Sequence, residues 1–519
     1  MDQSIIFPAF ESDDCNATYC LLFDRWTTEQ KCNFIRCNPN TCEGGGFVPW
    51  TEIIYCYTHP ILGTVGMVVA QILYIWLMKL IAERHLSHAI KRISQHWRLS
   101  DAVAGATIVS FGNGCPDVLG PTNTLFFSNT PNIDLALGEL LGGSVFILTV
   151  VTATIAVMQN FKVEVFTTLL NVIVYFGAVA FLFAYFYVTD FIQYWMPMVF
   201  IIMYICYVLA IVINQYLQRR KMPSLPPSRL SETSMDNIYY QDRALSPTPG
   251  QSKLSRAIRK MVSFHQSSRI LPPDRLKRWF KTPIVFFTLT IPTHRRFFNV
   301  YSTFLYVYIC PLFTLWNNRF LFKQILTIYF WQYSLIFSSF AMMIMMFLWH
   351  KKKIGTLKNL YTYGEFLMSL VWMNALSNEM QNVARTVGDT YGISDETLGL
   401  TLLAWSNSIP DLVTDTALAM KGRPEIAMAA AFATPLYNLL IGFGVPFFVA
   451  AVKGDLLAAD NTPTLQLLII FIPLSLACTF VELIMNKFRF TGYHSFMQYI
   501  LYVLFIASVI AGYFIQPYK

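Results

Sequence analysis

From about residue 60 onward, the chain alternates between long apolar runs and short polar stretches. A helix of about 20 apolar residues matches the thickness of the hydrocarbon core of a bilayer. Backbone groups in lipid must bond within their own segment, so we expect helices. The pattern predicts an all-α polytopic membrane protein with about 12 spans. The spans are residues 61–82, 99–126, 133–158, 165–188, 192–216, 297–317, 326–349, 359–384, 395–420, 425–452, 464–487 and 496–516.

The basic residues predict which side of the membrane each loop faces. With the N-terminus outside, the inner loops are residues 83–98, 159–164, 217–296, 350–358, 421–424 and 488–495. These loops and the adjoining span ends hold most of the 38 Lys and Arg residues, as the positive-inside rule requires. The alternation holds at every loop and supports both the span count and the orientation.

Composition agrees with a membrane protein. Of 519 residues, 55% are hydrophobic and 13% are charged, against about 25% charged in soluble domains. The mean hydropathy is +0.46. The net charge of +8 comes from the inner loops and therefore gives no argument for nucleic acid binding.

The polar N-terminal segment is rich in cysteine. Residues 1–59 hold six of the ten cysteines, namely Cys15, Cys20, Cys32, Cys37, Cys42 and Cys56. This density predicts a small disulfide-stapled cap in an oxidising compartment, with a pairing that the sequence leaves open. A zinc site is the alternative, disfavoured because no paired Cys-x-x-Cys spacing is present. Asn16 begins a glycosylation sequon.

One 18-residue stretch occurs twice. Residues 100–117 read SDAVAGATIVSFGNGCPD and residues 394–411 read SDETLGLTLLAWSNSIPD, with seven identical positions. The first copy lies in a span that runs from inside to outside, and the second lies in a span of the opposite direction. We therefore expect an inverted repeat, a pattern typical of transporters with an ion site near the bilayer midplane.

The repeat divides the chain into five parts. Each copy is the second span of a five-helix group, and two additional spans separate the groups. The parts are the Cys-rich extracytosolic segment 1–59, the first repeat 60–216, the basic Ser/Pro-rich inner loop 217–296, the two additional helices 297–349 and the second repeat 357–519.

Each copy gathers oxygen atoms on one helix face. Asn113 and Asp117 are four residues apart, and Pro116 frees a backbone carbonyl and is expected to break the helix. The second copy supplies Asn407, Ser408 and Asp411, and Pro410 acts in the same way. Carboxylate, amide and carbonyl oxygens are the ligands that hard cations such as Ca²⁺ and Na⁺ prefer.

The following span of each half is expected to complete the site. Thr434 and Asn438 are candidates in the second half, and Ser144 matches Thr434 in the first. In the first half, the position that matches Asn438 is Leu148, whose side chain cannot bind an ion. Thr149 and Thr152 are nearby and are candidates to supply the missing oxygen. Glu139 and Asp415 are accessory candidates.

Purely structural roles are the alternative for these residues. A single Asn or Pro in a membrane helix is commonly a packing or kink residue. Thr107 and Thr401 can hydrogen-bond back to their own helices. Glu139 and Asp415 can instead face an aqueous vestibule.

The two copies resemble the alpha-repeats of the cation/calcium exchanger superfamily. The residues that carry the likeness are 112–117, GNGCPD, and 404–411, AWSNSIPD. Asp in place of Glu after the proline, and the stretch CEGGGF at 42–47, are similar to the mitochondrial sodium/lithium/calcium exchanger branch. In that family the alpha-1 motif would be residues 100–158 and the alpha-2 motif residues 394–452.

The resemblance implies a ten-helix inverted-repeat core with alternating access. It implies ligands at Asn113, Asp117, Asn407 and Asp411, with Ser144, Thr434 and Asn438 behind them. Backbone carbonyls near Ser110 and Ala404 would complete sodium sites.

The expected function is secondary antiport of Ca²⁺ against Na⁺, with Li⁺ as a further counter-ion. The alternative is H⁺/Ca²⁺ exchange, motivated by Glu139. An intramembrane aspartyl protease and a passive channel are remote alternatives, because Gly-x-Gly-Asp and a selectivity filter are missing. We expect no enzyme activity and no cofactor. The partners are the ions and the bilayer, and the oligomeric state stays open.

Only the family resemblance predicts which cellular membrane contains the protein. The branch favours the mitochondrial inner membrane. The cysteine-rich cap and the sequon fit the plasma membrane or an endomembrane as the alternative.

Overall fold

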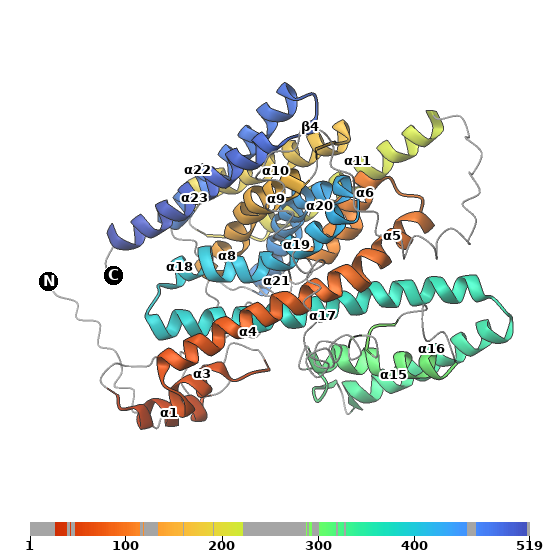
Figure 1. Ribbon diagram of the computed structural model, residues 1–519, viewed down its shortest axis with the longest axis horizontal. Helices are drawn as coiled ribbons and strands as arrows, with labels where there is room; N and C mark the ends of the chain where they lie inside the picture. Colours follow the sequence, from red (N-terminus) through yellow and green to blue (C-terminus); the bar gives the residue numbers. More distant parts are fainter. Residues whose placement is uncertain are drawn as a thin grey trace, which may run out of the picture.

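The computed structural model is built from helices (Figure 1). It describes residues 26–38, 42, 47–114, 118, 133–158, 160–189, 191–221, 287, 290–292, 300–317, 320–325, 328–453 and 463–515. The helices of the first half and of the following pair are α1 (Thr28–Cys37), α3 (Trp50–Glu52), α4 (Pro60–Ile81), α5 (Ser87–His96), α6 (Asp101–Ala104), α8 (Ile133–Phe146), α9 (Thr152–Met158), α10 (Val165–Val188), α11 (Trp195–Lys221), α15 (Val300–Asn317) and α16 (Phe330–His350).

The second half begins with the longest described helix, α17. Its helices are α17 (Ile354–Tyr391), α18 (Asp395–Leu398), α19 (Ala404–Met420), α20 (Pro424–Tyr437), α21 (Gly444–Lys453), α22 (Pro463–Met485) and α23 (Gly492–Ile515). Wider π-helical turns join neighbouring segments: η1 (Ile53–Tyr57), η2 (Ala82–Leu86), η3 (Gly105–Val109), η4 (Ile147–Val151), η5 (Gly399–Leu403) and η6 (Asn438–Phe443).

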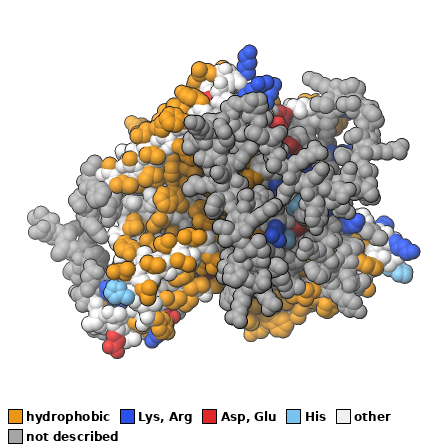
Figure 2. Space-filling view, viewed as in Figure 1, with side chains coloured by type: hydrophobic (Ala, Val, Ile, Leu, Met, Phe, Trp, Pro, Cys, Tyr) orange, Lys and Arg blue, Asp and Glu red, His pale blue; other side chains and the backbone are white. Residues whose placement is uncertain are grey.

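The all-α polytopic class is confirmed. Eight helices in the described part of the chain are long and apolar enough to cross a membrane. Helices α15, α17 and α19 lie in three of the other predicted spans, and the count of twelve stays a prediction. Apolar side chains cover a broad area of the face shown in Figure 2, as expected of a surface that meets lipid.

Two of the predicted boundaries are wrong. The expected inner loop 83–98 is mostly helical, because η2 and α5 extend α4 as far as His96. The extension is amphipathic and buries Ala89, Ile90 and Ile93, so packing continues the helix beyond the apolar run. Likewise α11 begins at Trp195 and continues to Lys221, where residues 192–216 were expected.

The two halves cross each other at the predicted repeats. The segment η3 of the first copy packs against α20 of the second half, and η5 of the second copy packs against α8 of the first. Small residues allow the close approach: a side chain at Gly105 would collide with the carbonyl of Ile426, and one at Gly142 would lie 3.1 Å from the Cα of Leu400. Each duplicated motif is therefore enclosed by the opposite half.

The long helices α4 and α17 pack along each other beside this core (Figure 1). The additional helices α15 and α16 form a pair, and both contact α17. A cavity of about 640 Å³ lies among these three helices, with walls that include Phe111, Asn317 and Asn374.

Loops predicted to share the inner side contact one another. Strand β1 (Phe161–Lys162) pairs antiparallel with β4 (Arg489–Phe490), which joins two such loops. Arg423 lies 3.4 Å from Asp101 in an ion pair that joins the loop before α20 to the start of the first copy. A short hairpin, β2 (Gln324–Ile325) with β3 (Ile328–Tyr329), connects α15 to α16.

The N-terminal cap contains disulfides, as expected. Cys32 is bonded to Cys56 across α1 and η1, and Cys37 and Cys42 each take part in a disulfide as well. Cys15, Cys20 and Asn16 lie outside the described residues. The Glu52 carboxylate accepts a hydrogen bond from Arg36, which raises the pKa of the Arg36 guanidinium.

The cap is anchored on the C-terminal part of α17. The Nδ2 of Asn382 donates to the carbonyl of Val48 at 2.8 Å, and the backbone N–H of Phe47 donates to Glu379. The hydroxyls of Thr51 and Thr386 lie 3.3 Å apart. Most of the predicted inner loop 217–296 lies outside the described residues.

The close contact of Gly105 with helix α20 gives a prediction about stability. In Gly105→Ala, the new Cβ would lie 2.8 Å from the Cβ of Ala429 and collide with the Ile426 carbonyl, which should cost about 1–3 kcal/mol. We expect a lower melting temperature for the purified protein in detergent. The matched control is Gly66→Ala, which meets nothing within 4 Å and should be neutral or stabilising. Equal melting temperatures for the two variants would contradict the close crossing of the halves.

Candidate ion-binding site

Both copies of the repeat contain a π-helical turn one or two turns before the polar motif. These are η3 in the first copy and η5 in the second, and the following spans contain η4 and η6. A π turn leaves backbone groups off the regular ladder and is frequent at functional sites. The two copies therefore share a π-helical turn at the same position as well as the sequence motif.

The expected break of the helix at Pro410 is wrong. Helix α19 runs continuously from Ala404 to Met420 with Pro410 inside it. Proline removes the bond to the carbonyl four residues earlier, that of Ser406. This carbonyl accepts a hydrogen bond from the hydroxyl of Ser377 on α17 at 3.3 Å, so a neighbouring helix compensates for the lost bond.

Asn113 of the first copy is bound by the second half. Its Nδ2 donates to Oδ1 of Asp415 at 3.2 Å, and the two residues are 302 positions apart in the chain. Asn113 is 6% exposed and Asp415 is 0% exposed. Asp415, an accessory candidate, therefore lies in the interior beside the repeat and does not face an aqueous vestibule.

Asn407 of the second copy has the complementary arrangement. Its Nδ2 donates to the carboxylate of Glu139 on α8, and its Oδ1 accepts from Nε2 of Gln381 on α17. Glu139 is also buried. Each repeat asparagine thus donates to an acid of the opposite half, and two residues named only as accessory candidates are central to the contact.

Asp411 lies one helical turn beyond Asn407 and is fully buried. Within the described part of the chain, neither of its carboxyl oxygens has a hydrogen-bond partner, and the same holds for Oδ2 of Asp415 and the hydroxyl of Thr434. Buried polar oxygens without partners are costly, and they mark a place where a missing ligand would supply the interaction.

The other candidates lie around this centre or bond to their own helices. Asn438 lies beside Gly114, because a side chain built on that glycine would collide with its Oδ1. The hydroxyl of Ser408 donates to the carbonyl of Gly143 at 3.3 Å. Ser110 and Ser144 donate to carbonyls of their own helices, at 2.7 Å and 2.9 Å.

The threonines are engaged with the backbone. Thr107 and Thr401 donate to the carbonyls four residues earlier, each at 2.6 Å. Thr149 and Thr152 do the same at 2.5 Å, so their hydroxyls are engaged and do not replace the ligand that is missing at Leu148.

The backbone of Ala404 faces Gly143 across the contact of the halves. Asp117 lies outside the described residues.

The charges of the site favour a cation. Among the described residues, Glu139, Asp411 and Asp415 have no Lys, Arg or His within ion-pair distance. A carboxylate at the middle of a bilayer costs about 2.5–3.5 kcal/mol on insertion scales unless it is paired. No group of three His, Cys, Asp or Glu side chains that could hold a metal occurs in the described ranges. Amide and hydroxyl oxygens, from Asn113 and Thr434, lie beside the carboxylates. This donor set suits hard cations.

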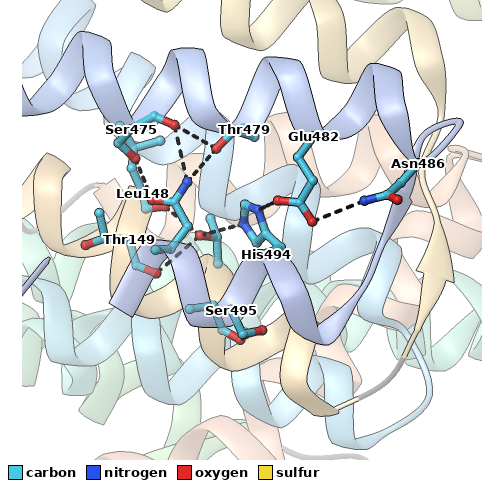
Figure 3. A network of polar contacts seen from close by, with 11 residues as sticks. Leu148, Thr149, Ser475, Thr479, Glu482, Asn486, His494 and Ser495 are labelled. Carbon is cyan, nitrogen blue, oxygen red and sulfur yellow. Dashed lines mark hydrogen bonds and ion pairs between the residues drawn. The ribbon is translucent and has the colours of Figure 1, made fainter. Parts of the chain in front are cut away.

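A polar network that includes Glu482 and His494 joins α22 and α23 to α9 (Figure 3). His494 on α23 is fully buried, and its Nδ1 lies 2.7 Å from Oε2 of Glu482 on α22. Its Nε2 lies 3.4 Å from the hydroxyl of Thr152 on α9. Because Thr152 donates its own proton to the Leu148 carbonyl, its oxygen is available to accept a hydrogen bond from Nε2 of His494.

The sequence reasoning missed Gln381 and the partners of the two asparagines. Gln381 could have been found as a polar residue within the predicted span 359–384. The pairing of Asn113 with Asp415 depends on how the halves cross, which spacing along the chain does not reveal.

The spans and the crossed halves define a multi-pass helical membrane protein. The chain matches the family model described as sodium/calcium exchanger protein over residues 65–213 and 361–510. It therefore belongs to the sodium/calcium exchanger protein family, and the resemblance noted in the sequence is confirmed.

Similar sequences agree with this membership. Putative sodium/calcium exchanger 6 of Caenorhabditis elegans is 32% identical, and the match covers 94% of this chain and 89% of that protein. The mitochondrial sodium/calcium exchanger protein of the same organism is 28% identical, with 95% and 98% covered. A structure of the sodium-calcium exchanger NCX_Mj matches with 14% identity and a TM-score of 0.46, covering 86% of this chain and 99% of that chain.

The network behind the site gives a second prediction. His494→Leu removes the partner of Glu482 and should destabilise the protein by about 1–3 kcal/mol, because a buried carboxyl loses its hydrogen bond. Thermal unfolding of the purified protein measures the loss. Ser508→Ala on the same helix is the control, since Ser508 is only half-buried and its hydroxyl donates to the Leu504 carbonyl of its own helix. An unchanged melting temperature for His494→Leu would show that the network contributes nothing.

Proposed function

We propose that the protein is a secondary antiporter that moves Ca²⁺ across a membrane against Na⁺. The observation that carries the proposal is the pair of contacts between the halves, Asn113 with Asp415 and Asn407 with Glu139, around the unpartnered oxygens of Asp411. Membership of the sodium/calcium exchanger protein family supports the same reaction.

The proposed ligands come from both halves of the chain. Asp411 and Asp415 supply carboxylate oxygens, and Thr434 supplies a hydroxyl. Glu139 is a central residue of the proposed site because its carboxylate accepts a hydrogen bond from Asn407. The remaining proposed ligands or neighbours are Asn113, Asp117, Ser144, Asn407, Ser408, Asn438 and the backbone near Ser110 and Ala404.

Exchange follows from competition for one set of charges. A Ca²⁺ ion or several Na⁺ ions neutralise the carboxylates, so a loaded site can be closed off from both sides of the membrane at lower cost than an empty one. Since the ligands belong to opposite halves, a relative movement of the halves changes which side of the membrane reaches them. The π turns beside the motifs are suited to absorb that movement.

Sodium is the proposed counter-ion. Homologues named as sodium/calcium exchangers favour Na⁺ over H⁺, and Li⁺ remains part of the proposal through the resemblance to the mitochondrial branch. No resident cofactor is proposed, because the ions are substrates.

The proposed location is the mitochondrial inner membrane. Support comes from relatives in worm and mouse that are named mitochondrial sodium/calcium exchanger proteins. The disulfides of the cap require an oxidising compartment on the outer side.

Asp411→Asn tests the site. Loss of the charge should reduce sodium-driven Ca²⁺ flux into proteoliposomes at least about tenfold, because a charged ligand contributes about 1.5–3 kcal/mol or more. The control is Thr401→Val on the same span, whose hydroxyl bonds to its own helix and which should retain flux. Sodium-driven flux that persists in Asp411→Asn would refute the proposed ligand. Flux in the unmodified protein that follows a proton gradient and ignores sodium would refute the counter-ion.

Imaging tests the location. The tagged full chain should coincide with an inner mitochondrial membrane marker in cells, because its relatives carry that name. Coincidence with a plasma membrane or endoplasmic reticulum marker would contradict the assignment.

A further inference from the structure

The cavity among α15, α16 and α17 lies beside the proposed ion site and is not part of it. Its volume of about 640 Å³ falls within the range of about 300–1,000 Å³ in which small-molecule sites are found. None of the described residues that line it carries a charge, and most of them are apolar. Water gains little from such walls, so an apolar molecule is a suitable occupant.

The walls of the cavity continue to the outer surface of the helices. Phe337 on α16 and Leu360 and Leu367 on α17 belong to these walls and are exposed. Exposed apolar side chains on membrane-spanning helices face hydrocarbon. An occupant can therefore enter from the bilayer without crossing a polar surface.

Two buried amides lie at one end of the cavity. Asn317, at the end of α15, is 8% exposed, and neither its Nδ2 nor its Oδ1 has a hydrogen-bond partner among the described residues. Asn374 on α17 is 7% exposed, and its side chain shows no hydrogen bond there either. Phe313 stacks on Trp372 with 4.4 Å between the ring centroids, which brings the two amides to the same level. Buried amides without partners are costly and mark a place where a ligand would supply the interaction.

The amides give the cavity a polar end and an apolar end. The hydroxyls of Thr303 and Tyr361, in another part of the walls, are hydrogen-bonded to each other. The amide end lies next to the N-terminal cap, because Trp316 stacks on Phe47 with 4.4 Å between the ring centroids. The shape of the chemistry is thus that of an amphipathic molecule with one polar end.

We propose that this cavity binds a neutral membrane lipid whose polar end carries hydroxyl groups. A hydroxyl both donates and accepts a hydrogen bond and so matches the amides of Asn317 and Asn374. An ionised head group would be buried without a counter-charge, which is costly. The apolar chain of the lipid would fill the remaining space and contact Phe111 of the first repeat. Binding at this place does not depend on the proposed function.

Photolabelling of the full chain in proteoliposomes tests the site. The probe is a monoacylglycerol with a diazirine in its acyl chain, and the control probe is the lysophosphatidic acid with the same chain, which differs only by its charged phosphate. The monoacylglycerol should label peptides of α15, α16 and α17, and unlabelled monoacylglycerol should compete. Equal or stronger labelling of these helices by the lysophosphatidic acid would overturn the neutral head group.

Two variants connect the labelling to the cavity. Ala341→Trp fills the space from α16 and should abolish the labelling. The matched control is Met343→Trp, on the same helix at an exposed position outside the cavity walls, which should leave it unchanged. Asn317→Leu should weaken binding about threefold to tenfold, the effect of losing one neutral hydrogen bond.

The melting temperature separates binding from a structural role. A residue that only supports the fold would lower it when replaced. Asn317→Leu without lipid should keep or raise the melting temperature, because it removes an unpartnered amide from the interior, and should reduce the rise that the monoacylglycerol causes.

Each outcome decides the inference. Labelling that persists in Ala341→Trp and at full affinity in Asn317→Leu would place the lipid elsewhere and overturn the site. Absence of labelling of these helices by either probe would also overturn it and would leave water or another segment of this chain as the content of the cavity. If Ala341→Trp does not fold, the affinity and melting temperature of Asn317→Leu decide.

Discussion

Carboxylates buried at the crossing of the two halves are the constraint on which the rest of the structure depends. A charge in the membrane interior requires partners, and here Asp415 and Glu139 obtain them from asparagines of the opposite half. These contacts require both duplicated motifs to enter the other repeat. The close glycine contacts at Gly105 and Gly142 make that approach sterically possible.

The surroundings of the site stabilise this arrangement from several directions. Helix α17 contacts the N-terminal cap through Asn382 and the repeat asparagine through Gln381, so the cap and the site share one helix. On the other side, the pair of Glu482 and His494 anchors α22 and α23 against the helix of Ser144. The site is therefore built on packed helices, which suits the precise geometry that ion selection demands.

Much of the fold could be predicted because membrane helices follow simple physical rules. Apolar length identified the spans, and the repeated Asn-x-x-Pro-Asp identified where the polar chemistry lies. The extension of α4 to His96 was missed because that segment is stabilised by tertiary packing of an amphipathic face. The pairings of Asn113 with Asp415 and of Asn407 with Glu139 were missed because they depend on the crossing of the halves.

A structure determined with bound Ca²⁺ or Sr²⁺ tests the central claim most directly. Anomalous diffraction from the ion locates it without assumptions about ligands. The account predicts one divalent ion between the halves, with an oxygen of Asp411 at about 2.3–2.6 Å and further oxygens from the first half. An ion bound by residues of one half alone, or bound away from Asp411, would contradict the account.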